Sequence, residues 1–390
     1  MKQASSRRAG KMRLISPLMA LSILSSTAGG IIMLAQLYLK DLQAAPIVIS
    51  LLTSFVWMGA LIGSTMWGTL ADRYSRKRLL FLILMTSAVG TGSLALFLPP
   101  AGVLPAVFLR MLMVTGLAPV TMAIVSAASM TDHRGRDLSY LSASRSTGSA
   151  LGKIIAGFLL AGVGYRLSFF SLALLPIVAC FFLFFLPRAE DAGRKERQSL
   201  STSLRRGGMN GLYLSGALRQ MGTSGAASLI FVYMATLGIP VGIMGTINAI
   251  GATTSILGVL VFGRLSDLVE RKVIFAFGFG ISALAPLIFA FSRGGWGIAL
   301  GYLTLGVSFS SVYAGSTSYI GDRTPMERQG TMFGLFNSSR GIGGVIGPLI
   351  AGALTPLVGF RSMLLVMAGI AFLGFLTVLA RTERGNGEHA

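Results

Sequence analysis

Long apolar stretches alternate with short polar segments along the whole of this 390-residue sequence. Crossing the hydrocarbon core of a bilayer takes about 20 apolar residues in an α-helix. Twelve stretches reach that length, so the pattern predicts an all-α membrane protein with twelve membrane-spanning helices. We expect the helices at 17–39, 45–70, 79–98, 103–130, 138–163, 167–186, 209–237, 241–262, 273–291, 297–320, 331–354 and 362–380.

The composition agrees with lipid as the solvent of this chain. Hydrophobic residues make up 53% of the sequence and charged residues 12%, and the mean hydropathy is +0.74. In soluble domains roughly a quarter of the residues are charged. The first apolar stretch is too long for a cleaved signal peptide, so we interpret it as a retained helix. A single cysteine, Cys180, leaves no partner for an internal disulfide.

Lysine and arginine are distributed unevenly between the two sides of the predicted membrane. The chain has 33 of them against 13 acidic residues, a net charge of +20. Most fall in alternate loops that include both termini, whereas Lys40, Arg166, Arg293 and Arg361 fall on the opposite side. The positive-inside rule then predicts a multi-pass protein of the cell inner (plasma) membrane with both termini cytoplasmic. Short loops without a recognition fold exclude a nucleic-acid partner, while membrane lipid is an expected partner.

The second half of the sequence repeats the first at a spacing of 195 residues. This repeat predicts two pseudo-symmetric six-helix bundles, at 1–186 and 209–390, joined by a cytoplasmic linker at 187–208. Parallel repeats of this kind are typical of transporters, with the solute site between the halves. The matching pairs include Tyr38 and Tyr233, Gly68 and Gly263, Asp72 and Asp267, Arg76 and Arg271, Lys77 and Lys272, and Arg145 and Arg340.

The loop at 68–78 carries the clearest motif of the sequence. It contains Gly68, Asp72, Arg73, Arg76 and Lys77, and it resembles the signature loop between helices 2 and 3 of the major facilitator superfamily. The resemblance extends over all twelve helices and implies the major facilitator fold and transport by alternating access. One departure is Ser75, where the family usually has glycine. A shorter echo of this motif in the second half contains Gly263, Asp267, Arg271 and Lys272.

The resemblance implies that these two loops form a conformational gate. Gly68 has no side chain and so permits close approach of helices, and Asp72 suits the positive end of another helix. The basic residues of both loops would then pair when the cytoplasmic side closes. An alternative is that the basic residues serve only as topology anchors.

The eleventh predicted helix carries a glycine and proline spacing that resembles the exporter signature of the same family. Its residues are Gly334, Gly343, Gly347, Pro348 and Gly352, although the family has this signature in helix 5. In the fifth helix here, Lys153 stands where proline is expected. Ordinary packing of small residues between helices is the alternative interpretation.

Five basic residues lie inside the predicted spans, and no acidic residue lies deep in any of them. Charges in a membrane are costly, so each is a candidate for binding solute. Cations without buried counter-ions favour an anionic or amphiphilic solute in a central cavity, although long side chains can also reach water or backbone carbonyls. The candidates are Arg110, Arg145, Lys153, Arg219 and Arg340.

The basic residues predict a small anionic or amphiphilic solute, and the resemblance implies a secondary transporter that exports it, which we expect to be a monomer. Arg110 with Gly116 resembles the helix 4 signature of proton-coupled exporters of the family, so a proton-coupled multidrug exporter is the alternative. Proton coupling would have to use Asp72, Lys153 or the solute itself. A receptor or a membrane-embedded enzyme is the second alternative, but no nucleophile and base, metal cluster or cofactor motif converges in the spans. We expect no enzyme activity.

Overall fold

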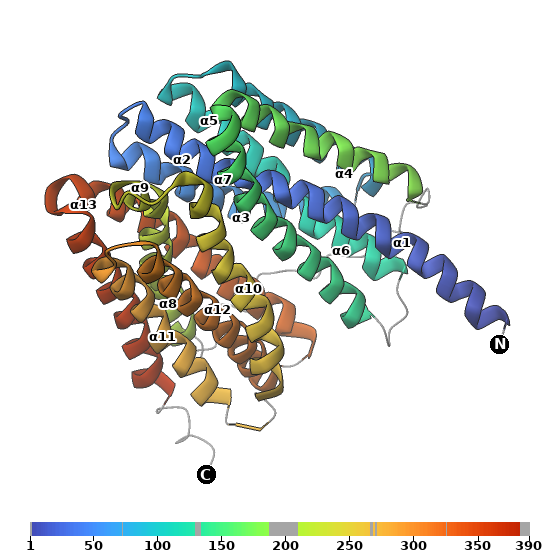
Figure 1. Ribbon diagram of the computed structural model, residues 1–390. Coiled ribbons are helices and arrows are strands. Elements are labelled where there is room, and N and C mark those ends of the chain that lie inside the picture. The colour runs from blue at the N-terminus through green and yellow to red at the C-terminus, as the bar shows by residue number, and fades with distance from the viewer. Residues whose placement is uncertain are drawn as a thin grey trace, which may run out of the picture. The chain divides into compact units, whose positions relative to one another are not determined.

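The computed structural model describes residues 2–71, 73–128, 134–186, 210–265, 268–269, 271–324 and 326–382. Within these residues the chain is built from helices and contains no strand (Figure 1). The described part therefore confirms the predicted all-α class.

The described residues of the first half form ten helical segments, several of which continue one another. α1 begins at Lys2, well before the predicted first span, because the polar arm has residues with adequate helix propensity. The segments are α1 (Lys2–Thr27), the 3₁₀ turn η1 (Ala28–Gly30), α2 (Ile31–Asp41), α3 (Pro46–Ala71), α4 (Arg76–Gly92), η2 (Ser93–Leu96), α5 (Pro100–Val114), α6 (Leu117–Ala128), α7 (Arg134–Phe181) and η4 (Phe182–Phe185).

Six helices are formed by the described residues of the second half. They are α8 (Asn210–Ser228), α9 (Ile230–Thr236), α10 (Val241–Leu265), α11 (Arg271–Phe291), α12 (Gly295–Arg323) and α13 (Met326–Thr382).

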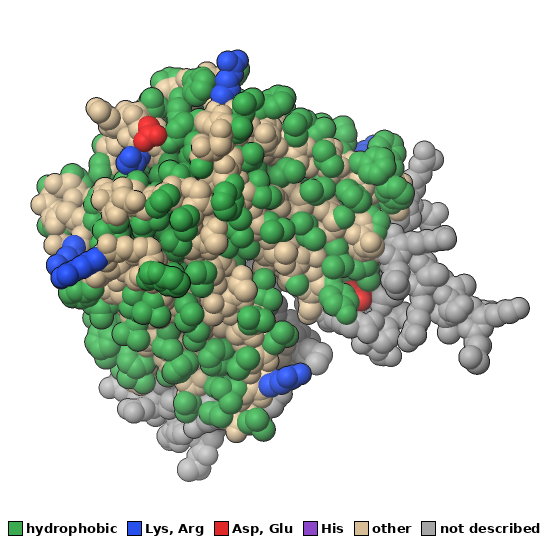
Figure 2. All heavy atoms as spheres, viewed as in Figure 1, with side chains coloured by type: hydrophobic (Ala, Val, Ile, Leu, Met, Phe, Trp, Pro, Cys, Tyr) green, Lys and Arg blue, Asp and Glu red, His purple; other side chains and the backbone are tan. Residues whose placement is uncertain are grey.

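The helical segments account for twelve membrane spans. Nine stretches of the described residues are long and apolar enough to cross a membrane, and two of them, of 49 and 50 residues, are each long enough for two crossings. The consecutive helices α8 and α9 supply the remaining span. The visible surface in Figure 2 is covered mainly by hydrophobic side chains, with few charged ones, as lipid-facing helices require.

Both double-length helices break at a glycine with a left-handed backbone. Gly164 in α7 has φ 73° and Gly359 in α13 has φ 76°. Glycine adopts such angles without the clash that a Cβ atom causes. The two glycines lie 195 positions apart, so the repeat extends to the turn between the last two spans of each half.

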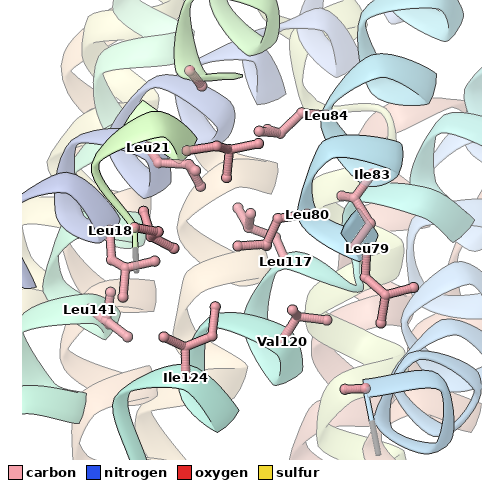
Figure 3. Close-up of a cluster of buried hydrophobic side chains, with 14 of the residues drawn as sticks. Leu18, Leu21, Leu79, Leu80, Ile83, Leu84, Leu117, Val120, Ile124 and Leu141 are labelled. Atoms are coloured by element: carbon pink, nitrogen blue, oxygen red, sulfur yellow. The ribbon is translucent and has the colours of Figure 1, made fainter. Parts of the chain in front are cut away.

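Two compact units are distinguished by their internal contacts. Unit 1 comprises Met1–Tyr38, Gly59–Glu196 and Val241–Thr246, and unit 2 comprises Leu39–Met58, Arg197–Pro240 and Ile247–Ala390. The core of unit 1 gathers leucine, isoleucine and valine side chains from α1, α4, α6 and α7, which point toward one another in Figure 3. The core of unit 2 is more aromatic and includes Phe275, Phe279 and Phe336.

The first turns of α3 and α10 pack on the glycine-rich helices α13 and α7. In unit 2, the Ser54 hydroxyl donates to the Val345 carbonyl over 2.8 Å, and a Cβ atom at Gly352 would meet Ser50. In unit 1, a Cβ atom at Gly157 would lie 2.9 Å from the Val241 carbonyl. These contacts explain why Leu39–Met58 belongs to unit 2 and Val241–Thr246 belongs to unit 1.

Glycines set the closest helix contacts in each unit. A Cβ atom on Gly152 of α7 would overlap the Thr27 carbonyl of α1, and one on Gly347 of α13 would overlap the Met221 carbonyl of α8. The two glycines are 195 residues apart. The contacts agree with the packing interpretation of these glycines, because small residues allow helix backbones to touch.

Gly152→Ala should destabilise the protein, because the added methyl group would overlap the Thr27 carbonyl of the neighbouring helix. Overpacking of this kind costs about 1–3 kcal/mol. We expect a lower Tm in detergent than for Gly162→Ala, since a Cβ atom at Gly162 meets nothing within 4 Å. Equal Tm values for the two variants would contradict the close contact.

Candidate functional site

Two basic residues of the predicted gate loop donate hydrogen bonds to backbone carbonyls in unit 1. Arg76 donates from Nη1 to the Ala123 carbonyl within α6 over 3.1 Å, and Lys77 donates to the Leu186 carbonyl after η4 over 3.3 Å. Arg73 is exposed, and Gly68 has no atom within 4 Å of a Cβ position.

Several gate candidates cannot be placed in the structure. Asp72 and Asp267 lie outside the described residues, as do the side chains of Arg271 and Lys272, which form the first turn of α11. Gly263 is exposed near the end of α10. The gate thus stays a prediction.

Arg110 on α5 is buried inside unit 1, with 1% of its surface exposed. Its Nε donates to the Thr91 hydroxyl of α4 over 2.8 Å. Gly90 makes room for it, because a Cβ atom there would lie 3.1 Å from the Arg110 Cβ. The Nη2 atom has no hydrogen-bond partner among the described residues.

Arg219 on α8 has a similar setting in unit 2 and is 3% exposed. Its Nη2 donates to the Ser308 hydroxyl of α12 over 2.9 Å, and Ser308 in turn donates to the Gly278 carbonyl over 3.0 Å. The guanidinium carbon lies 5.9 Å from the centre of the Phe279 ring, a cation–π distance. Like Arg110, Arg219 is therefore held by a hydroxyl group from a neighbouring helix.

Arg340 on α13 is half-buried and bonds only weakly to neutral groups. Its Nη2 donates to Oε1 of Gln220 over 3.3 Å, and its Nη1 donates to Oδ1 of Asn337 over 3.4 Å. The Nε atom is buried without a partner among the described residues. Of the two basic candidates of unit 2, Arg340 is thus more exposed than Arg219.

Arg145 and Lys153 on α7 are also half-buried. Arg145 donates to the hydroxyl of Ser142 over 3.1 Å. Ser142 and Asn337 are equivalent in the 195-residue repeat, so both arginines bond to the side chain three positions earlier. The backbone of Lys153 lies against Gly245, where a Cβ atom would overlap its carbonyl.

The structure separates the five basic candidates into two classes. Arg110 and Arg219 lie in packed interiors, whereas Arg145, Lys153 and Arg340 are partly exposed. The two carboxylates among the described side chains are Asp41 and Asp137. Asp41 pairs with Lys40 over 3.3 Å.

The sequence interpretation missed several polar residues. It omitted Asp137, which lies one residue before the predicted span 138–163 and is 1% exposed in α7. Thr91 and Ser308 gave no signal of their role, whereas the 195-residue spacing relates Ser142 to Asn337, a signal that the interpretation did not use.

Tyr38 and Tyr233 tie helix ends together in their own units. The Tyr38 hydroxyl donates to the Leu98 carbonyl over 3.2 Å, and the Tyr233 hydroxyl donates to the Ser292 carbonyl over 3.3 Å. The ring of Tyr38 also packs edge-on against Tyr165, with 5.3 Å between centres. These contacts favour a structural role for both tyrosines.

Comparison with known proteins gives a consistent result over nearly the whole chain. The model of the Major Facilitator Superfamily matches residues 16–211 and 212–390. The multidrug resistance protein MdtG of Dickeya zeae is 24% identical over 369 residues, which cover 90% of this chain and 89% of that protein. MdtG of Escherichia coli is 27% identical over 334 residues, which cover 81% and 80%.

Solved structures share the fold at lower sequence identity. A variant of the nucleoside transporter NupG matches with a TM-score of 0.80 and 15% identity, covering 94% of this chain and 99% of that one. The POT family transporter PepTSo matches with a TM-score of 0.78 and 13% identity, covering 95% and 97%.

Thr91→Val should lower the stability of the protein, because it removes the hydroxyl that accepts from Arg110 and keeps the volume. Leaving a buried charged donor unpaired costs about 1–3 kcal/mol. The expected result is a lower Tm in detergent. Thr86→Val is the control, since the Thr86 hydroxyl bonds to carbonyls of its own helix. A Tm equal to that of the control would show that Arg110 does not need this acceptor.

Proposed function

The chain belongs to the Major Facilitator Superfamily, and from this premise we propose that it exports small amphiphilic solutes that carry an anionic group. It is a secondary transporter that works by alternating access, and it is a transporter rather than an enzyme. The relatives named multidrug resistance proteins support export and an amphiphilic substrate. The substrate class rests on the basic residues.

Arg340 is the observation that carries the anionic part of the proposal. A guanidinium in a membrane protein is costly unless an acceptor with negative charge completes its hydrogen bonds. The described hydrogen-bond acceptors of Arg340 are two neutral amide oxygens at 3.3 Å and 3.4 Å, and its guanidinium carbon lies 5.9 Å from the centre of the Phe336 ring. A carboxylate or phosphate on a solute would replace them with shorter, charge-assisted bonds.

The other basic candidates take different parts in this proposal. Arg145, the repeat equivalent of Arg340, and Lys153 would contribute to solute binding from the first half. Arg110 and Arg219 would help by their positive potential, because their buried positions keep a solute from touching them in this conformation.

A multidrug exporter of hydrophobic compounds without a negative charge is the second candidate, and the names of the relatives favour it. The two candidate functions differ in whether the binding site accepts cationic compounds. Basic residues in the binding site would repel quaternary ammonium dyes.

The arrangement in the membrane follows from the sequence. We place both termini in the cytoplasm because the lysine and arginine residues concentrate in the loops on that side. We keep the expected division into 1–186, a linker at 187–208 and 209–390, with a monomer as the transporting form.

Arg340→Gln should weaken export of an anionic amphiphile, because an amide cannot form the charge-assisted pair. We expect a rise in KM of about tenfold or more, from the strength of charged hydrogen bonds. The KM of Arg340→Lys should lie between those of the wild type and Arg340→Gln, because lysine keeps the positive charge but lacks the planar guanidinium group. The measurement is uptake of labelled solute into inverted vesicles.

The matched control is Lys40→Gln, which removes an exposed charge paired with Asp41. Inhibition of transport by quaternary ammonium dyes at micromolar concentration, with no inhibition by carboxylates or phosphates, would favour the second candidate and refute the anionic site.

Asp72→Asn should slow transport while leaving the protein folded, because the gate proposal needs the carboxylate at the end of α3 when the transporter changes conformation. Transport rates in proteoliposomes test the slower transport, and the Tm in detergent tests whether the protein stays folded. Asp41→Asn is the control, since Asp41 is an exposed carboxylate outside the gate loops. Unchanged transport by Asp72→Asn would leave the motif with a topological role only.

A further inference from the structure

Two arginines of unit 2 lie beside the same stretch of α8. Arg219 belongs to α8, and its neighbour Gln220 accepts a hydrogen bond from Arg340 of α13 over 3.3 Å. Four residues earlier on α8, a Cβ atom at Gly216 would lie 3.4 Å from Cγ of Arg340. The side chain of Arg340 therefore follows the turn of α8 that carries Arg219, and the two guanidinium groups are close enough for their charges to repel each other.

Each of these two guanidinium groups has one donor without an acceptor. The Nε atoms of Arg219 and Arg340 are both buried and have no hydrogen-bond partner among the residues that the structure describes. The acceptors that the two side chains have there are oxygen atoms of Ser308, Gln220 and Asn337, which are all neutral. A neutral acceptor satisfies a donor but leaves the positive charge in place. In the described part of unit 2, both charges therefore remain uncompensated.

The internal repeat shows that the fold does not require the second of these charges. The residue 195 positions before Arg340 is also an arginine, Arg145, but the residue 195 positions before Arg219 is Leu24. A six-helix bundle of this sequence family thus packs with leucine at this position of its first helix. A buried cation in a membrane costs stability that leucine does not cost. The extra charge of unit 2 therefore favours a role in binding a ligand.

The number of charges indicates which ligand would be bound best. A solute with one negative charge would compensate one of the two arginines and leave the other as a buried charge, which is costly. A head group with two negative charges would compensate both. A phosphate monoester has this charge on one compact group, because its second pKa is about 6. Its oxygen atoms also form strong, charge-assisted hydrogen bonds with guanidinium groups.

We propose that the transported solute carries a doubly charged phosphate monoester as its head group, which Arg340 binds by hydrogen bonds and Arg219 attracts by its charge. This inference rests on the proposed function, because Arg340 is part of the anionic site there. It adds the chemical class of the head group. It also makes Arg219 the residue that distinguishes a doubly charged solute from a singly charged one.

The test compares the affinity of the purified full-length protein for three probes that share a naphthyl ring. At about pH 8, naphthyl phosphate carries close to two negative charges, whereas its methyl diester and naphthoate carry one each. The diester separates the effect of charge from that of the phosphate group itself. Isothermal titration calorimetry should give a Kd for naphthyl phosphate about tenfold lower than for the other two, the effect of one further charge interaction inside a protein.

Variants of Arg219 test its part in this preference. Arg219→Gln should remove most of the preference for naphthyl phosphate and should still bind the two singly charged probes. Arg219→Lys should keep the preference, because lysine keeps the positive charge. The control is Arg361→Gln, which removes an exposed guanidinium of unit 2 that lies 4.7 Å from the centre of the Phe291 ring. The Tm in detergent shows whether each variant is folded.

Three outcomes would contradict different parts of the inference. Equal affinity of the wild type for naphthyl phosphate and its methyl diester would overturn the doubly charged head group and leave the anionic site of the proposed function intact. This comparison needs no variant, so it decides even where Arg219→Gln fails to fold. A preference that a folded Arg219→Gln keeps would overturn the role of Arg219. Binding of quaternary ammonium dyes and of none of the three probes would refute the anionic site itself.

Discussion

Close approach of helix backbones at glycine is the constraint on which each half depends. In lipid no hydrophobic force drives helices together, so association relies on close packing of small residues. Gly152 brings α7 onto α1, and Gly347 brings α13 onto α8. The packing of α13 on α8 also positions a candidate solute-binding side chain. Arg340 lies three residues before Gly343, which also packs on α8, so its guanidinium reaches Gln220 of that helix.

The buried arginines show how a membrane bundle holds a charge without an acid beside it. Arg110 and Arg219 each receive one hydroxyl acceptor, from Thr91 and Ser308, on a neighbouring helix. A hydroxyl satisfies a donor but leaves the positive charge in place. The interiors of both units therefore contribute positive potential, and in the proposed site Arg340 presents the charge that an anionic solute would neutralise. This division of roles is the physical basis for preferring an anionic solute.

The sequence predicted the spans and the repeat because these depend on local apolar length and on residues that recur at a fixed spacing. The partners of the arginines were not predictable, since they depend on how neighbouring helices are rotated. Thr91 resembles many other hydroxyl residues of this chain until α4 and α5 are packed. Gly347 and Gly369 also look alike in the sequence, although the first touches a backbone and the second faces open space.

Comparing the two halves separates structural glycines from those with another role. Glycine occurs at the packing position in both halves, at 152 and 347, because a methyl group would overlap a carbonyl in each. At Gly369 the packing imposes no such requirement, and the first half has Leu174 at the equivalent position. An exposed glycine within a helix also lowers helix stability by about 1 kcal/mol relative to alanine. Close helix contact therefore accounts for the glycines that recur at equivalent positions of the two halves, and it does not account for Gly369.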